Sequence, residues 1–470
     1  MVTVLSHSTI IPSKQTPNPK LYSLCEQIKL RTHAPLLYVY KPHNNHNAST
    51  FLQTLQNSLS QALVIYYPLA GRLSWINGGR RWEIHCNSKG ALFLEAKCEE
   101  LTNLNQLGDF VPTNLVSQLI PNINYNLPLE DIPLLAVQVT RFPCGGFTLG
   151  VALCRAATDG TATMRFMNAW AKLARGENLD PNEFPCHDRT ILNSRKLTHL
   201  PSLHWQHREF NVPPIWVGSD LNGNREVSVA IVKLTREQVL KLKKKASSRV
   251  SFQPTSKDVH RTKPYSTFEV IAGHLWKCVT KARHIGNDDQ PTRLSTLVNC
   301  RNRLHPPLPN GYVGNVAFPT VTPTRSFNDL ICKPLGDAVE DVKKAIERVN
   351  GEYVTSALNY IDREKDMDLL RYNFHYPAKS VIDEGQYKGN PNLFVVSWMN
   401  FSYKDANFGL GEPVYFGPGY MDSEGKVFIM NNNNGGDGIV VAISLEASCM
   451  DSFKKYFYED IGEMFCNSKL

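Results

Sequence analysis

The sequence predicts a two-domain α/β protein, built from mixed sheets with flanking helices. A chain of 470 residues is too long for one ordinary hydrophobic core, so two domains are expected. Strand-like and helix-like segments alternate in both halves of the chain. Residues 180–224 are rich in proline and show little periodicity, which is typical of a crossover. We therefore expect a first domain at residues 1–200, a linker at 201–224 and a second domain at 225–470.

The first half contains strands and one long amphipathic helix. Residues 33–41 (HAPLLYVYK) predict a strand, and residues 50–63 predict a helix with leucines on one side. Two short strands at 73–75 and 82–85 flank a glycine-containing turn. No repeat of 20 to 50 residues is present, which disfavours a solenoid or a propeller.

The centre of this half is a buried strand at residues 147–154 that leads into a loop of small residues around Asp159-Gly160. A helix is expected next, because apolar residues at i, i+3, i+4 and i+7 form one face: Phe166, Ala169, Trp170 and Leu173. Gly176 is placed to end that helix. A strand end followed by such a loop is a common position for catalytic residues.

In the second half, two helix starts carry the pattern of a capping box, in which a Ser or Thr is followed three residues later by Glu or Gln. They are Thr235 to Gln238 and Ser266 to Glu269. Strands are predicted at residues 393–398, 425–430 and 439–445, and a last helix at 451–458.

Composition and charge exclude several classes of protein. The net charge of +8 is spread along the chain, without the aromatic and basic motifs of RNA-binding domains, so no nucleic-acid partner is expected. The first residues lack the basic region and apolar run typical of a signal peptide, and no run of about 18 apolar residues that could span a membrane is present. The 11 cysteines form no Cys-x-x-Cys pair, so we expect reduced thiols, no metal site and a cytoplasmic, monomeric protein.

Three motifs resemble those of the plant BAHD acyltransferases, and the resemblance covers most of the chain. Residues 67–72 (YPLAGR) are similar to an early block of that family, and residues 302–315 (NRLHPPLPNGYVGN) to its mid-chain segment. Near the C-terminus the family has Asp-Phe-Gly-Trp-Gly, where this chain has Asn407, Phe408, Gly409, Leu410 and Gly411. Within the family, residues 394–430 look most like the spermidine hydroxycinnamoyl transferases.

The resemblance implies a fold and a reaction. The family has a two-domain fold like that of chloramphenicol acetyltransferase, with a channel between the domains. Its members move acyl groups from coenzyme A thioesters to alcohols or amines, so the implied partners are a small-molecule donor and acceptor, with acyl-coenzyme A as cosubstrate and no permanently bound cofactor. The loop from Arg155 to Gly160 is expected at the centre of that channel.

The general base of the family is missing from this loop. The family carries His-x-x-x-Asp, whereas this chain has Arg155 and Asp159 at the first and last of these positions. Arginine remains protonated in proteins, so Arg155 cannot accept a proton. It can bind a carboxylate or phosphate, or stabilise an oxyanion. The resemblance gives Asp159 a structural role in which it pairs with an arginine of the mid-chain segment, Arg301 or Arg303.

Ser266 and Thr267 have two interpretations. In the first, Ser266 only caps its helix. In the second, which the resemblance implies because coenzyme A enters near this segment in the resembling enzymes, Ser266 and Thr267 bind its phosphate groups at the helix start. His274, inside the same helix, is expected to be a packed core histidine and not a replacement base.

Three functions are compatible with the sequence. The first is an acyl-coenzyme A-dependent transferase that acylates an amine, polyamine or alkaloid-type acceptor with an atypical active site. The second is an enzyme of another type on the same scaffold, such as a lyase or cyclase. The third is a binding or regulatory protein without catalysis. We place the transferase first, because the blocks outside the two altered motifs, at 155–159 and 407–411, are intact and because a neutral amine needs a base less than an alcohol does.

Overall fold

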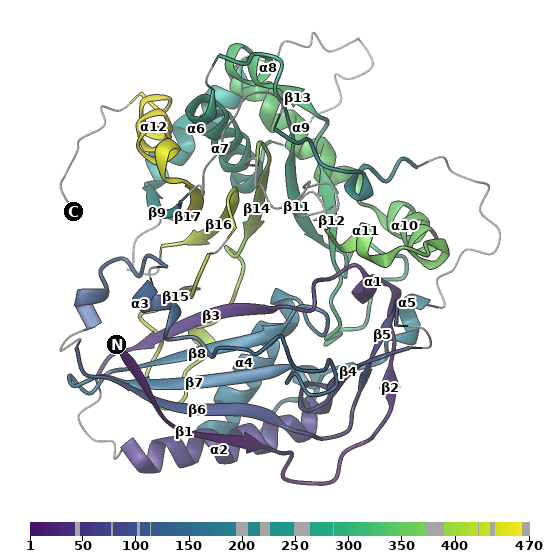
Figure 1. Ribbon diagram of the computed structural model, residues 1–470, viewed down its shortest axis with the longest axis vertical. Helices are drawn as coiled ribbons and strands as arrows, with labels where there is room; N and C mark the ends of the chain where they lie inside the picture. The colour runs from purple at the N-terminus through teal and green to yellow at the C-terminus, as the bar shows by residue number, and fades with distance from the viewer. Residues whose placement is uncertain are drawn as a thin grey trace.

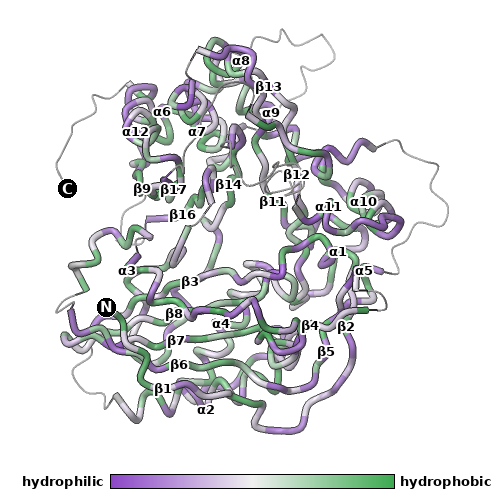
Figure 2. Tube along the Cα trace, in the orientation of Figure 1, coloured by the Kyte–Doolittle hydropathy of each residue, from purple (hydrophilic) through white to green (hydrophobic). Residues whose placement is uncertain are grey.

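Two six-stranded sheets, one above the other in Figure 1, form the framework of the protein. The computed structural model describes residues 1–42, 48–76, 79–100, 104–112, 114–193, 205–216, 226–248, 264–284, 286–372, 390–421, 423–432 and 438–462. In Figure 2, hydrophobic segments follow the strands of both sheets. Among these residues, no helix is both long enough and apolar enough to cross a membrane.

The first sheet has the strand order β1-β6-β7-β8-β3-β15. Its strands are β1 (Val2–Ile10), β3 (His33–Tyr40), β6 (Ala91–Cys98), β7 (Leu135–Arg141), β8 (Phe147–Cys154) and β15 (Tyr415–Pro418). Strands β6 and β7 are parallel, and the other pairs are antiparallel. Helices α2 (Ala48–Ile65) and α4 (Gly160–Ala174) pack together against this sheet. Trp170 of α4 is fully buried and donates to the Leu55 carbonyl of α2 at 3.2 Å.

The second sheet has the order β12-β11-β14-β16-β17-β9. Its strands are β9 (Val227–Leu234), β11 (Leu294–Asn299), β12 (Ala317–Val321), β14 (Leu393–Ser397), β16 (Lys426–Asn431) and β17 (Ile439–Glu446). Among the described residues, most of the helical part of its core comes from α6 (Arg236–Ser248), α7 (Thr267–Arg283), α9 (Leu335–Arg348) and α12 (Ala447–Glu459), and Leu330 of α8 (Phe327–Cys332) joins it. Both predicted capping boxes are confirmed: Thr235 pairs with Gln238 at the start of α6, and Ser266 with Glu269 at the start of α7.

The remaining elements are short or lie at the side of the two sheets. A three-stranded sheet contains β2 (Lys20–Leu21), β4 (Arg72–Trp75) and β5 (Trp82–His85), and β10 (Pro291–Thr292) pairs with β13 (Arg325–Ser326). The other helices are α1 (Leu24–Gln27), α3 (Asn114–Ser117), α5 (Thr190–Asn193), α8 (Phe327–Cys332), α10 (Gly351–Arg363) and α11 (Met367–Tyr372).

The two sheets do not divide the chain at a single point. Strand β15 comes from the predicted second domain, yet it pairs with β3 in the first sheet, with Tyr415 opposite Val39. The predicted linker at 201–224 is described only at 205–216, where Glu209 and Phe210 are buried. A single boundary in the sequence therefore assigns β15 to the wrong sheet. The described part of the predicted linker packs against the rest of the protein.

The central stretch matches its prediction closely. Strand β8 covers residues 147–154 as expected, and α4 begins directly after the loop at Asp159. The helix ends before Gly176, whose φ of 77° lies in the left-handed region that glycine adopts without strain. This places the Arg155 to Gly160 loop at the end of a central strand of the first sheet.

Candidate active site

A cavity of about 420 Å³ lies between the two sheets, at the Arg155 to Gly160 loop. Its walls come from the segment before β3, the end of β8, the start of α4, and from β11, β12, β14 and β16 of the other sheet. Arg155, Asp159 and Gly160 all line it. The candidate residues of the central loop are therefore together in one cavity to which both sheets contribute.

Arg155 is fixed by polar contacts on both its backbone and its side chain. Its backbone N–H donates to the Thr32 carbonyl at 3.0 Å, and its backbone carbonyl accepts from Asn315 Nδ2 at 2.7 Å. Its Nη1 donates to Thr32 Oγ1 at 2.9 Å and to the His33 carbonyl. The guanidinium is therefore held against the start of β3, at the wall of the cavity.

The carboxylate of Asp159 accepts four hydrogen bonds from described residues, and all of them hold the loop in place. Arg301 donates to it through Nη1 at 2.7 Å and Nη2 at 3.0 Å. The backbone N–H groups of Ala162 and Val316 donate at 3.0 and 2.9 Å, and through the first of these bonds Asp159 acts as the N-cap of α4. Burial opposes the charge on Asp159, but Arg301 and these hydrogen bonds outweigh it and lower the pKa of the carboxyl.

Of the two arginines considered from the sequence, Arg303 lies elsewhere. It donates to the carbonyls of Ile346 and Val349 at the end of α9. Only Arg301 bridges Asp159 to the mid-chain segment, and it also donates to the Tyr312 and Gly314 carbonyls.

No histidine is among the described residues that line this cavity. His33 lies beside Arg155, but its side chain is buried and both ring nitrogens are engaged. Nε2 donates to the Pro133 carbonyl at 2.8 Å, and Nδ1 accepts from the Tyr125 hydroxyl at 2.9 Å. Burial lowers the pKa of His33 to about 4. His33 is thus a neutral structural residue and is not a candidate for a general base.

A second cavity, of about 850 Å³, adjoins the starts of α6 and α7. Thr267 lines it together with three cations, Arg236, Lys243 and Lys404. Ser266 does not line it, and its hydroxyl accepts from the Glu269 N–H at 3.2 Å as a helix cap. Phe401 lines both cavities and therefore lies between them.

The segment Asn407 to Gly411 forms a tight turn beside α4. Asn407 Oδ1 accepts from the N–H groups of Gly409 and Gly411 at 2.9 and 3.0 Å, and both glycines have positive φ. Arg175 at the end of α4 donates to the Asn407 carbonyl. The ring of Phe408 is buried, 4.8 Å from that of Trp170. These contacts are structural, and the amide oxygen of Asn407 supplies the acceptor that the turn needs.

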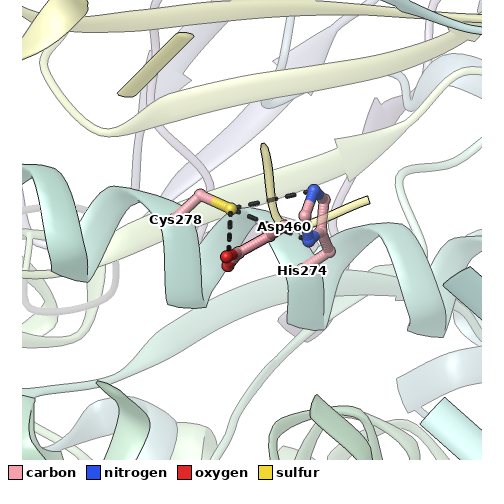
Figure 3. Close-up of side chains that lie close together, drawn as sticks. All are labelled: His274, Cys278 and Asp460. Atoms are coloured by element: carbon pink, nitrogen blue, oxygen red, sulfur yellow. Dashed lines mark hydrogen bonds between the residues drawn. The ribbon is translucent and has the colours of Figure 1, made fainter. Parts of the chain in front are cut away.

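One group of possible metal ligands lies away from both cavities, at His274, Cys278 and Asp460 (Figure 3). The Cys278 sulfur is 3.7 Å from the imidazole nitrogens and 3.9 Å from Asp460 Oδ2. However, Lys281 donates to both oxygens of Asp460 at 2.7 and 2.6 Å, so the carboxylate already has a cationic partner. His274 is buried and donates to the Phe457 carbonyl at 2.9 Å, as a core histidine does. We interpret the group as packing between α7 and α12.

Comparison with known proteins identifies the family. The model of the Transferase family matches residues 1–460. The chain belongs to that family, the BAHD acyltransferases. It is 38% identical over 98% of its length to hydroxycinnamoyl-CoA:piscidic acid hydroxycinnamoyltransferase from Actaea racemosa, which is covered completely. It is also 35% identical to anthranilate N-benzoyltransferase protein 2 from Dianthus caryophyllus, over 97% of this chain and 99% of that one.

Solved structures show the same fold. Vinorine synthase aligns with a TM-score of 0.69 and 22% identity, over 96% of each chain. F. graminearum TRI101 complexed with coenzyme A and deoxynivalenol aligns with a TM-score of 0.72 and 15% identity, over 93% of this chain and 96% of that one. The protein is thus an acyl-coenzyme A-dependent acyltransferase of the BAHD family, with the two-domain fold of that family and acyl-coenzyme A as cosubstrate.

Sequence reasoning missed three residues that line the first cavity: Lys29, Thr32 and Tyr125. They lie in segments without a motif, the first two before β3 and the third between α3 and β7. No periodicity or spacing marks them, because only the tertiary fold brings these segments next to the end of β8.

Proposed function

We propose that this BAHD protein transfers an acyl group from a coenzyme A thioester to an amine, without a general base at the position of the family histidine. The observation that carries the proposal is the position of Arg155 in the lining of the first cavity. In the motif of the family, this residue is the histidine that acts as the base. A positioned base contributes about 10²- to 10⁴-fold to the rate. A neutral amine is a stronger nucleophile than an alcohol, so its attack on a thioester depends less on that contribution.

The reaction is balanced without a protein base. The amine nitrogen bonds to the thioester carbonyl carbon, the C–S bond breaks and coenzyme A leaves as a thiolate. One N–H proton passes to water. The guanidinium of Arg155 stays protonated throughout and offers only hydrogen-bond donors, which suit the developing oxyanion or a bound carboxylate.

The donor would enter through the second cavity. Thr267 is the first residue of α7, whose N-terminal N–H groups favour an anion, and Arg236 and Lys243 line the same cavity. We therefore propose that these residues bind the phosphate groups of coenzyme A, whereas Ser266 acts as the helix cap. Phe401, which lines both cavities, would then be next to the thioester.

Several relatives support an amine as acceptor. The Dianthus caryophyllus protein is by name an anthranilate N-benzoyltransferase, and an Avena sativa relative with 34% identity is a 5-hydroxyanthranilate N-hydroxycinnamoyltransferase. The likeness of residues 394–430 to spermidine hydroxycinnamoyl transferases points to amines as well. A monomeric state and a cytoplasmic location stay predictions from the sequence.

The test compares matched amine and alcohol acceptors, such as 2-phenylethylamine and 2-phenylethanol, with hydroxycinnamoyl, benzoyl and acetyl thioesters. The wild type is expected to acylate the amine and to leave the alcohol almost unchanged. Arg155→His restores a proton acceptor and should raise turnover of the alcohol by about 10²-fold. Arg208→His is the control, since Arg208 is exposed and outside both cavities.

Two results would contradict the proposal. If the wild type transfers no acyl group to any amine in a broad panel, the lyase, cyclase and binding alternatives take its place. If Arg155→His has the melting midpoint of the wild type but no gain with the alcohol, the reaction does not use this position as its site of proton transfer.

A further inference from the structure

A serine, a histidine and a glutamate meet at the side of the protein, away from both cavities. Ser356 belongs to α10, beside the upper sheet in Figure 1, whereas His207 and Glu209 belong to the described part of the predicted linker. Ser356 and His207 are 149 residues apart in the chain, so only the fold brings them together. None of the three residues lines either cavity. The cluster is therefore separate from the acyl-transfer site.

The three side chains form a continuous line of hydrogen bonds. His207 Nδ1 is 3.3 Å from Glu209 Oε1, and His207 Nε2 is 3.0 Å from Ser356 Oγ. An ionised carboxylate can only accept, so Nδ1 carries the ring proton and Nε2 has a free lone pair. The Ser356 hydroxyl then donates to Nε2. A hydroxyl that donates to a histidine oriented by a carboxylate is the arrangement of an activated serine nucleophile.

The carboxylate of Glu209 is fixed on its other side by Tyr353. The Glu209 side chain is fully buried, and its Oε2 accepts from the Tyr353 hydroxyl. Burial, and after it the charge of Glu209, raises the pKa of the Tyr353 phenol, so Tyr353 stays a donor. The His207 ring is 5% exposed and lies 4.8 Å from the ring of Tyr353 and 5.7 Å from that of Tyr360. These contacts hold the imidazole in one orientation.

Ser356 is oriented differently from its neighbour in the helix. The Thr355 hydroxyl donates to the Gly351 carbonyl at 2.7 Å, four residues earlier, which is a common pattern for Ser and Thr in helices. The hydrogen bond of Ser356 goes to His207, in another segment of the chain. Ser356 is only half-buried, so a reactant can reach its hydroxyl.

An aromatic surface adjoins this hydroxyl. Tyr360 follows Ser356 by four residues and therefore lies on the same face of α10. Its ring is stacked on that of Phe210 at 5.5 Å, yet Tyr360 is 42% exposed. A fixed ring with an open face next to a nucleophile favours a reactant that carries a planar aromatic group.

We propose that Ser356 is a nucleophile, activated by His207, that hydrolyses small aryl esters. His207 is the general base, and Glu209 is a positioning residue that holds the imidazole in the required tautomer. Tyr360 offers its exposed ring to the aryl group of the ester. This activity goes beyond the proposed acyl transfer and uses none of the residues assigned to it.

The reaction is balanced in two steps. In the first, Ser356 Oγ bonds to the ester carbonyl carbon, and His207 Nε2 takes the hydroxyl proton. The C–O bond to the leaving group breaks, and the phenol leaves with the proton from Nε2. In the second step, water attacks the acyl-serine with His207 again as the base. The products are a carboxylic acid and the free serine.

The experiment labels the full-length protein with an aryl fluorophosphonate, from which an activated serine displaces fluoride. Peptide mapping by mass spectrometry then locates the adduct, which is expected at Ser356. The rate of labelling should fall by about 10²-fold in His207→Asn, because the variant lacks the base. In parallel, hydrolysis of p-nitrophenyl acetate should be lost in Ser356→Ala.

Glu209→Gln tests the positioning role. The maximal rate of labelling should fall, whereas the probe concentration that gives half of this rate should stay the same, since Glu209 acts through the imidazole and not on the probe. Ser247→Ala is the control, because Ser247 is an exposed helical serine whose hydroxyl donates to the Lys243 carbonyl at 2.9 Å. This variant should be labelled at the wild-type rate. Melting midpoints show which variants are folded, and Glu209→Gln replaces His207→Asn if the latter is not.

Each outcome decides for or against the site. An adduct at Ser356 that forms slowly in the folded His207 or Glu209 variant supports it. An interpretation of the cluster as packing alone predicts no adduct at Ser356, or similar adducts on several surface serines, and either result overturns the proposal. So does a labelling rate that is the same in these variants, or ester hydrolysis that continues unchanged in Ser356→Ala.

Discussion

Replacement of Asp159 by asparagine removes the charge that joins β8 and α4 to the mid-chain segment. Wild-type Asp159 accepts two hydrogen bonds from Arg301 and two from backbone N–H groups, and its side chain is 3% exposed. An asparagine keeps one acceptor oxygen and points an NH₂ group at the remaining donors. Asp159→Asn should therefore lower stability more than it changes the chemistry of acyl transfer.

The expected loss of stability follows from the buried ion pair between Asp159 and Arg301. Breaking a buried ion pair by removing one partner costs about 3–5 kcal/mol. Arg301 retains the Tyr312 and Gly314 carbonyls as acceptors, which favours the lower end, about 3 kcal/mol. A double-mutant cycle with Arg301→Gln should return a coupling of about 2–3 kcal/mol, because the two side chains are in direct contact.

The loss should also depend on pH, with a sign fixed by the lowered pKa of Asp159. In the unfolded chain an aspartate titrates near pH 3.9. The ionised form is favoured in the folded state, so the stabilisation is complete above that pH and disappears as the pH falls through the lower folded pKa. The difference between wild type and Asp159→Asn should therefore be full at about pH 7 and shrink in acid.

The free energy of unfolding is measured for both proteins across this pH range, by urea titration and by calorimetric melting. Asp131→Asn is the control, because Asp131 forms an exposed ion pair with Lys89 and its loss should stay within about 0.5 kcal/mol. An Asp159→Asn variant with the stability of the wild type and no transferase activity would refute the structural role and make Asp159 a catalytic residue.

Two further predictions concern the neighbours of this loop. Gly160→Ala places a methyl group 2.2 Å from the Phe401 ring, so the ring must move. The value of kcat/KM should then fall more for bulky acyl donors than for acetyl-coenzyme A. An equal effect on both donors would contradict a position of Phe401 beside the thioester. Asn407→Ala removes the acceptor for the Gly409 and Gly411 N–H groups. It should lower the free energy of unfolding by about 1–2 kcal/mol, and the melting midpoint with it. Asn407→Asp keeps an acceptor oxygen and should not; if both variants melt alike, the amide oxygen does not hold the turn.

Local patterns predicted the elements next to the site well. The run of apolar residues at 147–154 gave the strand, and the Ser266 to Glu269 spacing gave the start of α7, because both signals are contained in a few consecutive residues. The family resemblance also suggested an arginine partner for Asp159, and the structure places Arg301 there. Spacing alone would not have chosen between Arg301 and Arg303.

Contacts between distant segments could not be predicted. Strand β15 is four residues long and pairs with β3, which is more than 370 residues earlier in the chain. A strand this short and rich in Gly and Pro carries almost no signal of its own. Lys29 and Thr32 are ordinary polar residues in the sequence, and only the packing of the segment before β3 against the end of β8 places them in the cavity.

The pH dependence of acyl transfer to amines tests the central claim that the protein supplies no base. The measurement is kcat/KM for two amines of different pKa, with a benzoyl thioester. In the wild type, the rate should rise with the neutral fraction of each amine, so its midpoint should move with the pKa of the acceptor. In Arg155→His, a second rise near the histidine pKa of about 6.5 should appear for both amines. A wild-type profile with one midpoint, independent of the amine, would reveal a titrating base in the enzyme and contradict the account.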